Sequence, residues 1–469
     1  MVSIALGTVE VQVMPQGSPG GYLGALEARI KGIVEAVVSR ILEAQLEAEV
    51  TQKLGRESYE RRAQMPRKVT TGECRRCGTH IGKQFRRNGH YQRQLLTRWG
   101  KVQFQMPQIV CECGGQVQMD FQTVRGRQRI WDNVAREMRE RYGWGESLRG
   151  IKASLDHWLG SSLGLRTINT RIHSIARMVA PWQQTQQADC PPVVRLDGVW
   201  VPQMVDTGKQ RIDALGRHRP VKRGVRRPLL VAQGVWPSSG RQEIVAWSLA
   251  QAESADEWGV LLDQMWGRGV QPERGLCMLV ADGGAGLLSA RHLAYWNVPL
   301  QRCIFHKLRN VWRDLVVPLG YDAAAGRAYK RRLIRQAARI WQARKLATAQ
   351  ERHTTWCLEW EAEQPQAVAT LRRDFDLTLT YYDVQATAAT LGHSWSATYL
   401  RTTSHLERLF RGLRRRLRQA VVVHSGIGLT ALAAQYFTRW SAGQSPNPLD
   451  AFDWPLAIER ALLAPNPIS

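Results

Sequence analysis

The sequence predicts a multi-domain α+β protein with a central α/β domain, and three observations support this fold class. At 469 residues the chain is longer than one ordinary domain. From residue 193 onward, segments of strand-like alternation are followed by helix and strand patterns in turn, whereas the flanking regions have helical spacing. Hydrophobic residues make up 44% of the chain and charged residues 22%, as in globular proteins with real cores.

The charge balance predicts a polyanionic partner. The chain has 65 Lys+Arg against 40 Asp+Glu, a net charge of +25. A protein this basic binds polyanions well, because each neutralised phosphate releases condensed counterions; the alternative is that the charge only keeps the protein soluble.

Neither a membrane span nor a secretory signal is evident. The chain has no run of about 18 apolar residues, and residues 1–17 lack the basic start and long apolar stretch of a signal peptide. We therefore expect no membrane partner and an intracellular location, where the eight cysteines are thiols or metal ligands.

The N-terminal region, residues 1–65, is expected to be helical. Residues 22–62 place apolar side chains at helical spacing and contain no proline, which predicts one or two amphipathic helices. Self-association and packing within the chain explain this pattern equally well.

Residues 66–125 are expected to form a zinc-ribbon-like β module. A CxxC pair and a CxC pair flank two strand-like stretches, and a hairpin would bring the four thiolates together around a structural Zn²⁺: Cys74, Cys77, Cys111 and Cys113. The gap between the pairs is longer than in most ribbons, and reduced, metal-free thiols are the alternative. His80 and His90 are reserve ligands or ordinary surface histidines.

Residues 126–180 are expected to form a helix-turn-helix domain of three short helices. One helix ends near Leu159, a Gly/Ser turn follows, and the next begins near Arg166 with Thr167 as a possible cap. The second helix would enter a DNA major groove with Arg166, Asn169 and Arg171. An ordinary helical hairpin is the alternative.

Residues 181–192 are expected to be a linker, and residues 193–312 with 401–440 the catalytic core. Three strands joined by hairpins, followed by alternating helix and strand, have the order of a ribonuclease-H-like α/β domain. Residues 313–400 predict a helical insertion domain, and 441–469 an irregular tail. Some of the 18 tryptophans could stack on bases, but core packing explains most of them.

Three carboxylates in the core are candidates for a two-metal site that cleaves phosphodiesters. Asp197 lies on the first strand and Asp282 ends the fourth, and these strands are neighbours in the expected sheet. Both could therefore bind Mg²⁺ (or Mn²⁺), with Glu407 in the first turns of a later helix as third ligand. Alternatively, Glu407 is only a salt-bridge partner. Asp206 and Asp213 belong to a polar hairpin excursion.

The helix that contains Glu407 is rich in arginine. These side chains are expected to line the DNA backbone beside the metals: Arg408, Arg411, Arg414, Arg415, Arg416 and Arg418.

Four segments in this order, "RLDGVWV", "VADGGAGLLSA", "QRCIFHKLRN" and "TTSHLERLFRGLRRRLR", resemble the motif series of Mutator-type DDE transposases. The resemblance covers roughly residues 40–440. It implies that Asp197, Asp282 and Glu407 are the catalytic metal ligands. It also implies that Cys303 and His306 form the family's C-x-x-H motif, with His306 in a positioning role near the scissile phosphate. The cysteine-rich module is a departure, since many members lack it.

The resemblance predicts a bacterial insertion-sequence transposase. It would bind terminal inverted repeats of double-stranded DNA, cleave them in a metal-dependent reaction and transfer the freed strand to target DNA. We expect a homodimer on DNA, because two ends must be brought together, and a cytoplasmic, nucleoid-associated location. A non-catalytic DNA-binding regulator and a ribonuclease-H-like nuclease without strand transfer are the alternatives.

Overall fold

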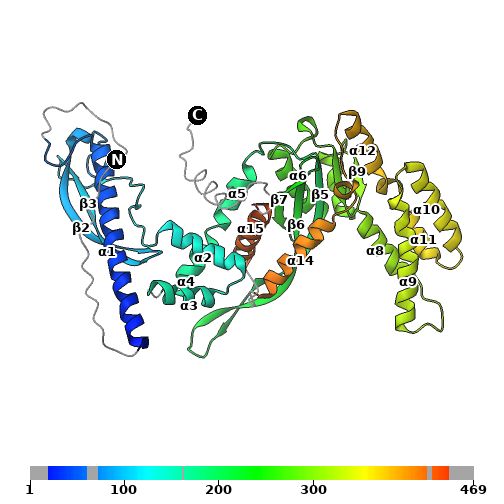
Figure 1. Cartoon of the computed structure of the whole chain (residues 1–469), viewed down its shortest axis with the longest axis horizontal. Helices are drawn as coiled ribbons and strands as arrows, with labels where there is room; N and C mark the ends of the chain where they lie inside the picture. The colour runs from blue at the N-terminus through cyan, green and yellow to red at the C-terminus, as the bar shows by residue number, and fades with distance from the viewer. Residues whose placement is uncertain (1–18, 61–71, 161–162, 420–424, 443–469) are drawn as a thin grey trace. The chain divides into compact units, whose positions relative to one another are not determined.

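The computed structural model describes residues 19–60, 72–160, 163–419 and 425–442 and shows a mixed α+β protein (Figure 1). The chain divides into two compact units, Met1–Ile172 and His173–Ser469, which are described separately. None of the helices in these described ranges is long and apolar enough to cross a membrane.

The first unit begins with one long helix packed on a β hairpin. Helix α1 (Pro19–Leu54) lies against strands β2 (Phe85–Thr97) and β3 (Gly100–Cys111), which pair antiparallel. Its buried side chains recur every four residues along one face: Val38, Leu42, Leu46, Val50 and Leu54. The predicted helical region is thus a single helix within the described residues, and its apolar stripe packs inside the chain.

The rest of the first unit consists of a small cysteine-bearing sheet and short helices. Strands β1 (Glu73–Cys74) and β4 (Val117–Gln118) pair antiparallel, and a short 3₁₀ turn, η2 (Gly82–Gln84), directly precedes β2. Helices α2 (Asp132–Trp144), α3 (Leu148–Leu159) and α4 (Leu165–His173) follow. The cap expected at Thr167 is wrong: α4 begins earlier, and the Thr167 amide already donates to the Gly164 carbonyl.

A five-stranded mixed sheet is the centre of the second unit. Its strands, in the spatial order β7-β6-β5-β8-β9, are β5 (Val193–Ile212), β6 (His218–Trp236), β7 (Arg241–Leu249), β8 (Met278–Ala281) and β9 (Leu300–Arg302). The first three pair antiparallel, and β5, β8 and β9 pair parallel. The predicted hairpin-connected strands and the β5–β8 neighbourhood are therefore present.

Helices cover both faces of this sheet. On β8, Leu279 and Ala281 pack with α6 (Ala255–Gly267) and α7 (Ala285–Ala294), whereas Met278 and Val280 pack with α8 (Ile304–Asp314). The alternation of side chains along a strand, with apolar residues at every position, is what a sheet buried on both faces requires. A 3₁₀ turn, η3 (Pro272–Arg274), precedes β8.

Most of residues 313–400 are helical, as predicted (Figure 1). The elements are α9 (Ala323–Ala338), η4 (Arg339–Gln342), α10 (Leu346–Trp360), α11 (Pro365–Arg372), η5 (Asp376–Thr378), α12 (Thr380–Thr390) and α13 (Ala397–Leu400). Trp341, Trp356 and Trp360 are buried among them, so they serve packing rather than base stacking.

Three further helices pack in the second unit. Helix α5 (Ala176–Gln184) runs four residues into the stretch expected to be a linker and contacts α15 (Gly426–Ala442). Helix α14 (Ser404–Gln419) contains Glu407. The expected tail lies outside the described residues beyond position 442.

Candidate functional site

The parallel pairing of β5 with β8 positions the first aspartate. Arg195 is the register partner of Val280, so the same register two residues further on sets Asp197 beside Asp282, which directly follows β8. Asp197 is only 8% exposed. Its Oδ1 accepts a hydrogen bond from the Gly198 amide at 2.8 Å, while its buried Oδ2 has no partner within the described structure. A buried carboxylate oxygen without a donor is costly unless a proton or cation satisfies it.

Two helices bring a histidine and a glutamate to this aspartate. His306 lies in the first turn of α8, and its Nε2 is 3.4 Å from Glu407 Oε1 on α14. One ligand atom each of Asp197, His306 and Glu407 lies within 4.8 Å of the others. Residues more than 200 positions apart thus converge on one point, where they could hold a metal ion.

Cys303 and Thr403 hold the histidine in place. Thr403 is completely buried, its amide donates to Cys303 Sγ at 3.2 Å, and its Oγ1 lies 3.4 Å from His306 Nδ1. Because Nδ1 is engaged in this way, Nε2 is the nitrogen that faces Glu407. Thr403 was not among the predicted site residues, although it immediately precedes the helix that contains Glu407.

Asp282 lies near this cluster but outside its 4.8 Å limit. Its Oδ1 accepts a hydrogen bond from the Gly284 amide at 2.9 Å, so the carboxylate is turned toward its own loop. Its negative charge still contributes to raising the pKa of Asp197. Of the three predicted carboxylates, two are therefore brought together with His306, and the third lies beside them.

The pKa values in the cluster reflect carboxylates gathered around one protonated histidine. Burial, with the charges of Asp282 and Glu407, raises the pKa of Asp197 to about 7 against the opposing effect of His306. Burial opposes protonation of His306, yet its hydrogen bonds to Cys303 and Glu407 raise its pKa to about 10. The same hydrogen bond lowers the pKa of Glu407. The imidazolium therefore supplies the positive charge that these carboxylates need.

Glu253 is a further acidic residue next to the cluster. A Cβ built at Gly198 would lie 3.1 Å from Glu253 Oε1, so a glycine after Asp197 leaves room for this carboxylate. Desolvation and the charge of Asp282 raise the pKa of Glu253. No motif in the sequence marks this glutamate, and only the packing of its loop beside β5 reveals it.

The four cysteines of the first unit form the predicted cluster. The Sγ atoms of Cys74 and Cys113 are 3.4 Å apart, those of Cys77 and Cys113 3.5 Å, and those of Cys77 and Cys111 3.8 Å. Tetrahedral Zn²⁺ with bonds of about 2.3 Å needs sulfurs roughly 3.8 Å apart, which these separations approach. The donor set therefore fits zinc.

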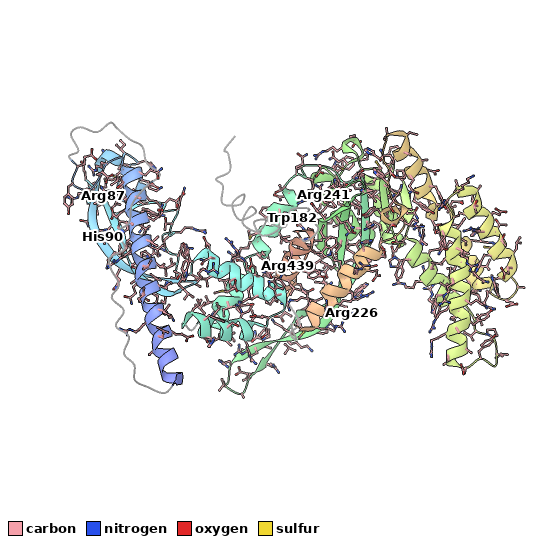
Figure 2. The ribbon with its side chains drawn as sticks, viewed as in Figure 1. Arg87, His90, Trp182, Arg226, Arg241 and Arg439 are labelled. Carbon is pink, nitrogen blue, oxygen red and sulfur yellow. The ribbon has the colours of Figure 1, made fainter. Side chains whose placement is uncertain are left out.

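Backbone groups around the sulfurs support the same geometry. The amides of Arg76 and Gly115 donate to Cys74 Sγ and Cys113 Sγ, each at 3.4 Å. A Cβ at Gly115 would meet Cys74 Sγ at 2.7 Å, so only glycine fits there. The two reserve histidines are engaged elsewhere: His80 with the Gly72 carbonyl and His90 with Glu47 (Figure 2 labels His90).

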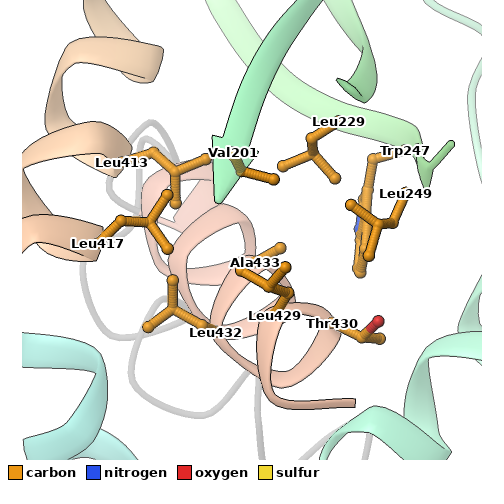
Figure 3. Close-up of a pocket in the computed structure, with 10 residues that line it drawn as sticks. All are labelled: Val201, Leu229, Trp247, Leu249, Leu413, Leu417, Leu429, Thr430, Leu432 and Ala433. Carbon is orange, nitrogen blue, oxygen red and sulfur yellow. The ribbon is translucent and has the colours of Figure 1, made fainter. Parts of the chain in front are cut away.

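Helix α14 presents a basic face and buries an apolar one. Leu413 and Leu417 pack with α15 and the strands beneath it (Figure 3). The opposite face has exposed arginines and borders a groove of about 510 Å³, lined by Arg408, Leu409, Arg411, Gly412, Arg415, Arg418, Tyr436 and Trp440. Arg414 is also exposed.

The prediction for Arg416 is wrong. This side chain is only 5% exposed, because it falls on the same side of the helix as Leu413 and Leu409, one and two turns away. It therefore does not line a path for DNA.

The predicted recognition helix has the expected amphipathic pattern. Ile168 and Ile172 are buried, while Arg166 and Arg171 are exposed and Asn169 is half-buried. DNA contact by these three polar residues stays a prediction.

This is a basic protein with a candidate metal centre suited to phosphate chemistry. Three features define it: the mixed α+β fold, the cluster of carboxylates and a histidine, and the groove lined by arginines. The profile described as "Transposase, Mutator family" matches residues 24–424. The chain belongs to this family of transposases, which confirms the resemblance seen in the sequence motifs.

Named relatives agree with this assignment. The chain is 25% identical over 365 residues to a transposase for insertion sequence element IS406 of Burkholderia multivorans, covering 76% of this chain and 83% of the relative. It is 29% identical over 314 residues to that of IS6120 of Mycolicibacterium smegmatis, covering 65% and 85%.

Among solved structures, the Drosophila P element transposase strand transfer complex aligns with a TM-score of 0.41 and 11% identity, over 65% of this chain and 91% of that one. A similarity this low supports no inference about mechanism.

Proposed function

We propose that this transposase binds the terminal inverted repeats of an insertion sequence, cleaves DNA there and joins the freed 3′ end to target DNA by a DDE-type mechanism. Two observations on Asp197 carry this proposal: its buried Oδ2 has no hydrogen-bond partner among the described residues, and one of its carboxylate oxygens lies within 4.8 Å of a ligand atom of Glu407. A transposase acting on chromosomal DNA would work in the cytoplasm at the nucleoid, as a homodimer that holds two ends.

The carboxylates fit the hard divalent cations that this chemistry uses. Oxygen ligands suit Mg²⁺ and Mn²⁺, and the orphaned oxygen of Asp197 is satisfied if a cation binds. Asp197, Glu407 and Asp282 would hold the metal ions. Such ions would supply activation of the attacking hydroxyl group and stabilisation of the leaving oxygen.

The protein's own side chains position the reactants around that centre. Thr403 and Cys303 orient His306, and its Nε2 faces Glu407, so the imidazolium would hold this carboxylate in place and put a positive charge near the scissile phosphate. The exposed arginines of α14 would neutralise the phosphates that approach the centre.

The domain assignment follows the same proposal. The sheet order, three antiparallel strands followed by two parallel ones, supports a ribonuclease-H-like catalytic core over 193–312 and 401–440, with 313–400 inserted as a helical domain. A Zn²⁺-bound module over 66–125 and a helix-turn-helix over 126–180 would bind the element ends.

The test is incubation of the protein with labelled duplexes that contain the sequences flanking its gene. We expect nicking at one defined position with Mg²⁺ or Mn²⁺, none without divalent metal, and joined products when the ends are supplied precut. Cleavage without joining would favour a simple nuclease. DNA binding without cleavage, equal in wild type and Asp197→Ala, would favour a DNA-binding regulator, and cleavage retained by Asp197→Ala would refute the catalytic role of Asp197.

A further inference from the structure

The hairpin of β5 and β6 extends far beyond the sheet as a two-stranded arm, residues 202–227 (Figure 1). β8 pairs with β5 only at residues 193–195, and β7 pairs with β6 only at 229–236. The paired strands of the arm reach Ile212 and His218. Eleven residues from 202 to 212 span about 35 Å at strand rise, comparable to one turn of duplex DNA.

The arm is strongly basic. It contains eight Lys and Arg side chains and two aspartates. Lys222, Arg223 and Arg226 are exposed and form no ion pair with any described residue (Figure 2 labels Arg226). Because side chains alternate along a strand, Lys222 and Arg226 lie on one face of the ribbon and Arg223 on the other. Positive charge is thus present on both faces.

The tip of the arm is a well-connected turn with exposed apolar side chains. Asp213 Oδ1 accepts hydrogen bonds from the amides of Leu215 and Arg217 at 2.9 and 3.0 Å. Its Oδ2 accepts from the side chains of Arg217 and Arg219 at 3.1 and 3.0 Å. Leu215 remains 73% exposed and Ile212 66% exposed. The turn therefore presents apolar groups at the end of a basic ribbon.

Charge complementarity identifies the occupant. A second copy of this chain carries the same net charge of +25 and would repel the arm. A DNA major groove is about 12 Å wide and admits a two-stranded β ribbon, with phosphates on both walls. In proteins that bind the minor groove, apolar side chains are often inserted between base steps and bend the duplex.

We propose that the β5–β6 arm is a DNA-binding element: its basic strands contact phosphates on both sides of a duplex groove, and Leu215 enters the groove at the tip. This role rests on the proposed function, since it takes duplex DNA as the partner. It is separate from cleavage, because the arm residues lie outside the carboxylate cluster.

The test measures DNA binding without cleavage. In an Asp197→Asn background, affinity for a duplex from the sequence flanking the gene is measured by fluorescence anisotropy at several salt concentrations. Replacing Lys222, Arg223 and Arg226 by serine should reduce the slope of log K against log salt by about 2.7, since each lost phosphate contact removes about 0.9. Between roughly 50 and 200 mM salt, the variant should then lose about 40-fold less affinity than its parent.

The matched control removes three exposed arginines from one face of α9: Arg327, Arg331 and Arg335. Equal slopes for the arm variant and its parent, or an equal reduction in the control, would overturn the proposal. An unchanged slope with a loss of oligomer mass in sedimentation would instead make the arm a protein-binding element.

The tip is tested by Leu215→Ser, which changes no charge. We expect an unchanged salt slope and a weaker fluorescence increase from 2-aminopurine placed in the duplex, because fewer bases are unstacked. An equal fluorescence increase would refute insertion of the tip. If wild-type protein cleaves and joins DNA but the arm variant keeps its parent's salt slope, only the proposal for the arm is refuted. If the arm variant has a reduced salt slope but wild-type protein does not cleave DNA, only the catalytic proposal is refuted.

Discussion

Replacing Asp197 by asparagine should stabilise the metal-free protein at alkaline pH while it abolishes DNA cleavage. The carboxylate is 8% exposed and one of its oxygens has no partner among the described residues. Its pKa is raised from 3.8 to about 7, chiefly by burial. About three pKa units at 1.36 kcal/mol each correspond to about 4 kcal/mol against the ionised form.

The sign of the effect follows from proton linkage. Because the folded-state pKa is raised, the folded protein binds the proton more tightly, and stability falls as pH rises from about 4 to about 7. Asparagine carries no charge and escapes this loss. His306 adds its own loss of stability above about pH 6.5, but its pKa is raised to about 10 chiefly by Cys303 and Glu407, which wild type and variant both retain, so Asp197 dominates the difference.

The assay is thermal unfolding of wild type and Asp197→Asn near pH 5 and near pH 8. The stability advantage of the variant should grow by about 3 kcal/mol between these values, which for a unit of this size raises its relative Tm by about 6 °C. Added Mg²⁺ should raise the Tm of wild type but not of the variant. Asp206→Asn, an exposed aspartate on the same strand, is the control without a pH-dependent difference.

The opposite sign would refute the reasoning. If Asp197 were chiefly a structural ion-pair partner of His306, the variant would be less stable than wild type near pH 8. A Tm difference independent of pH would likewise show that Asp197 does not carry the burial penalty inferred here.

Three further predictions concern the second carboxylate, the cysteine cluster and α14. Glu407→Gln should abolish cleavage and lower the pKa of His306, measured by NMR titration, because a hydrogen-bonded carboxylate is lost; an unchanged pKa would contradict the contact. Gly115→Ala should reduce bound zinc, measured by atomic emission, since a Cβ would meet Cys74 Sγ at 2.7 Å, whereas Gly126→Ala, with open space around it, should not; equal zinc in both would contradict the site. Serine at Arg408, Arg411 and Arg415 should reduce the salt slope of DNA binding by about 2.7, and an unchanged slope would remove the groove from the DNA path.

Local sequence patterns determined much of this protein. Two-residue alternation predicted the hairpins, because strand faces alternate whatever the partner, and a continuous apolar run predicted the buried strand before Asp282. Paired cysteines predicted their cluster, since few arrangements bring four thiols together at such spacing. The order of strands and motifs predicted that Asp197 and Glu407 meet, and the family match confirmed the resemblance.

Only the tertiary structure decided which side chains meet and which turn away. The contact between His306 and Glu407 spans about a hundred residues and depends on how α8 and α14 dock on the sheet. The burial of Arg416 depends on which face of α14 packs. The hydrogen bond that the Gly284 amide donates to Asp282 depends on the conformation of one loop. Such contacts depend on packing between distant segments, whereas the pattern within each segment reports only its local structure and which of its faces is apolar.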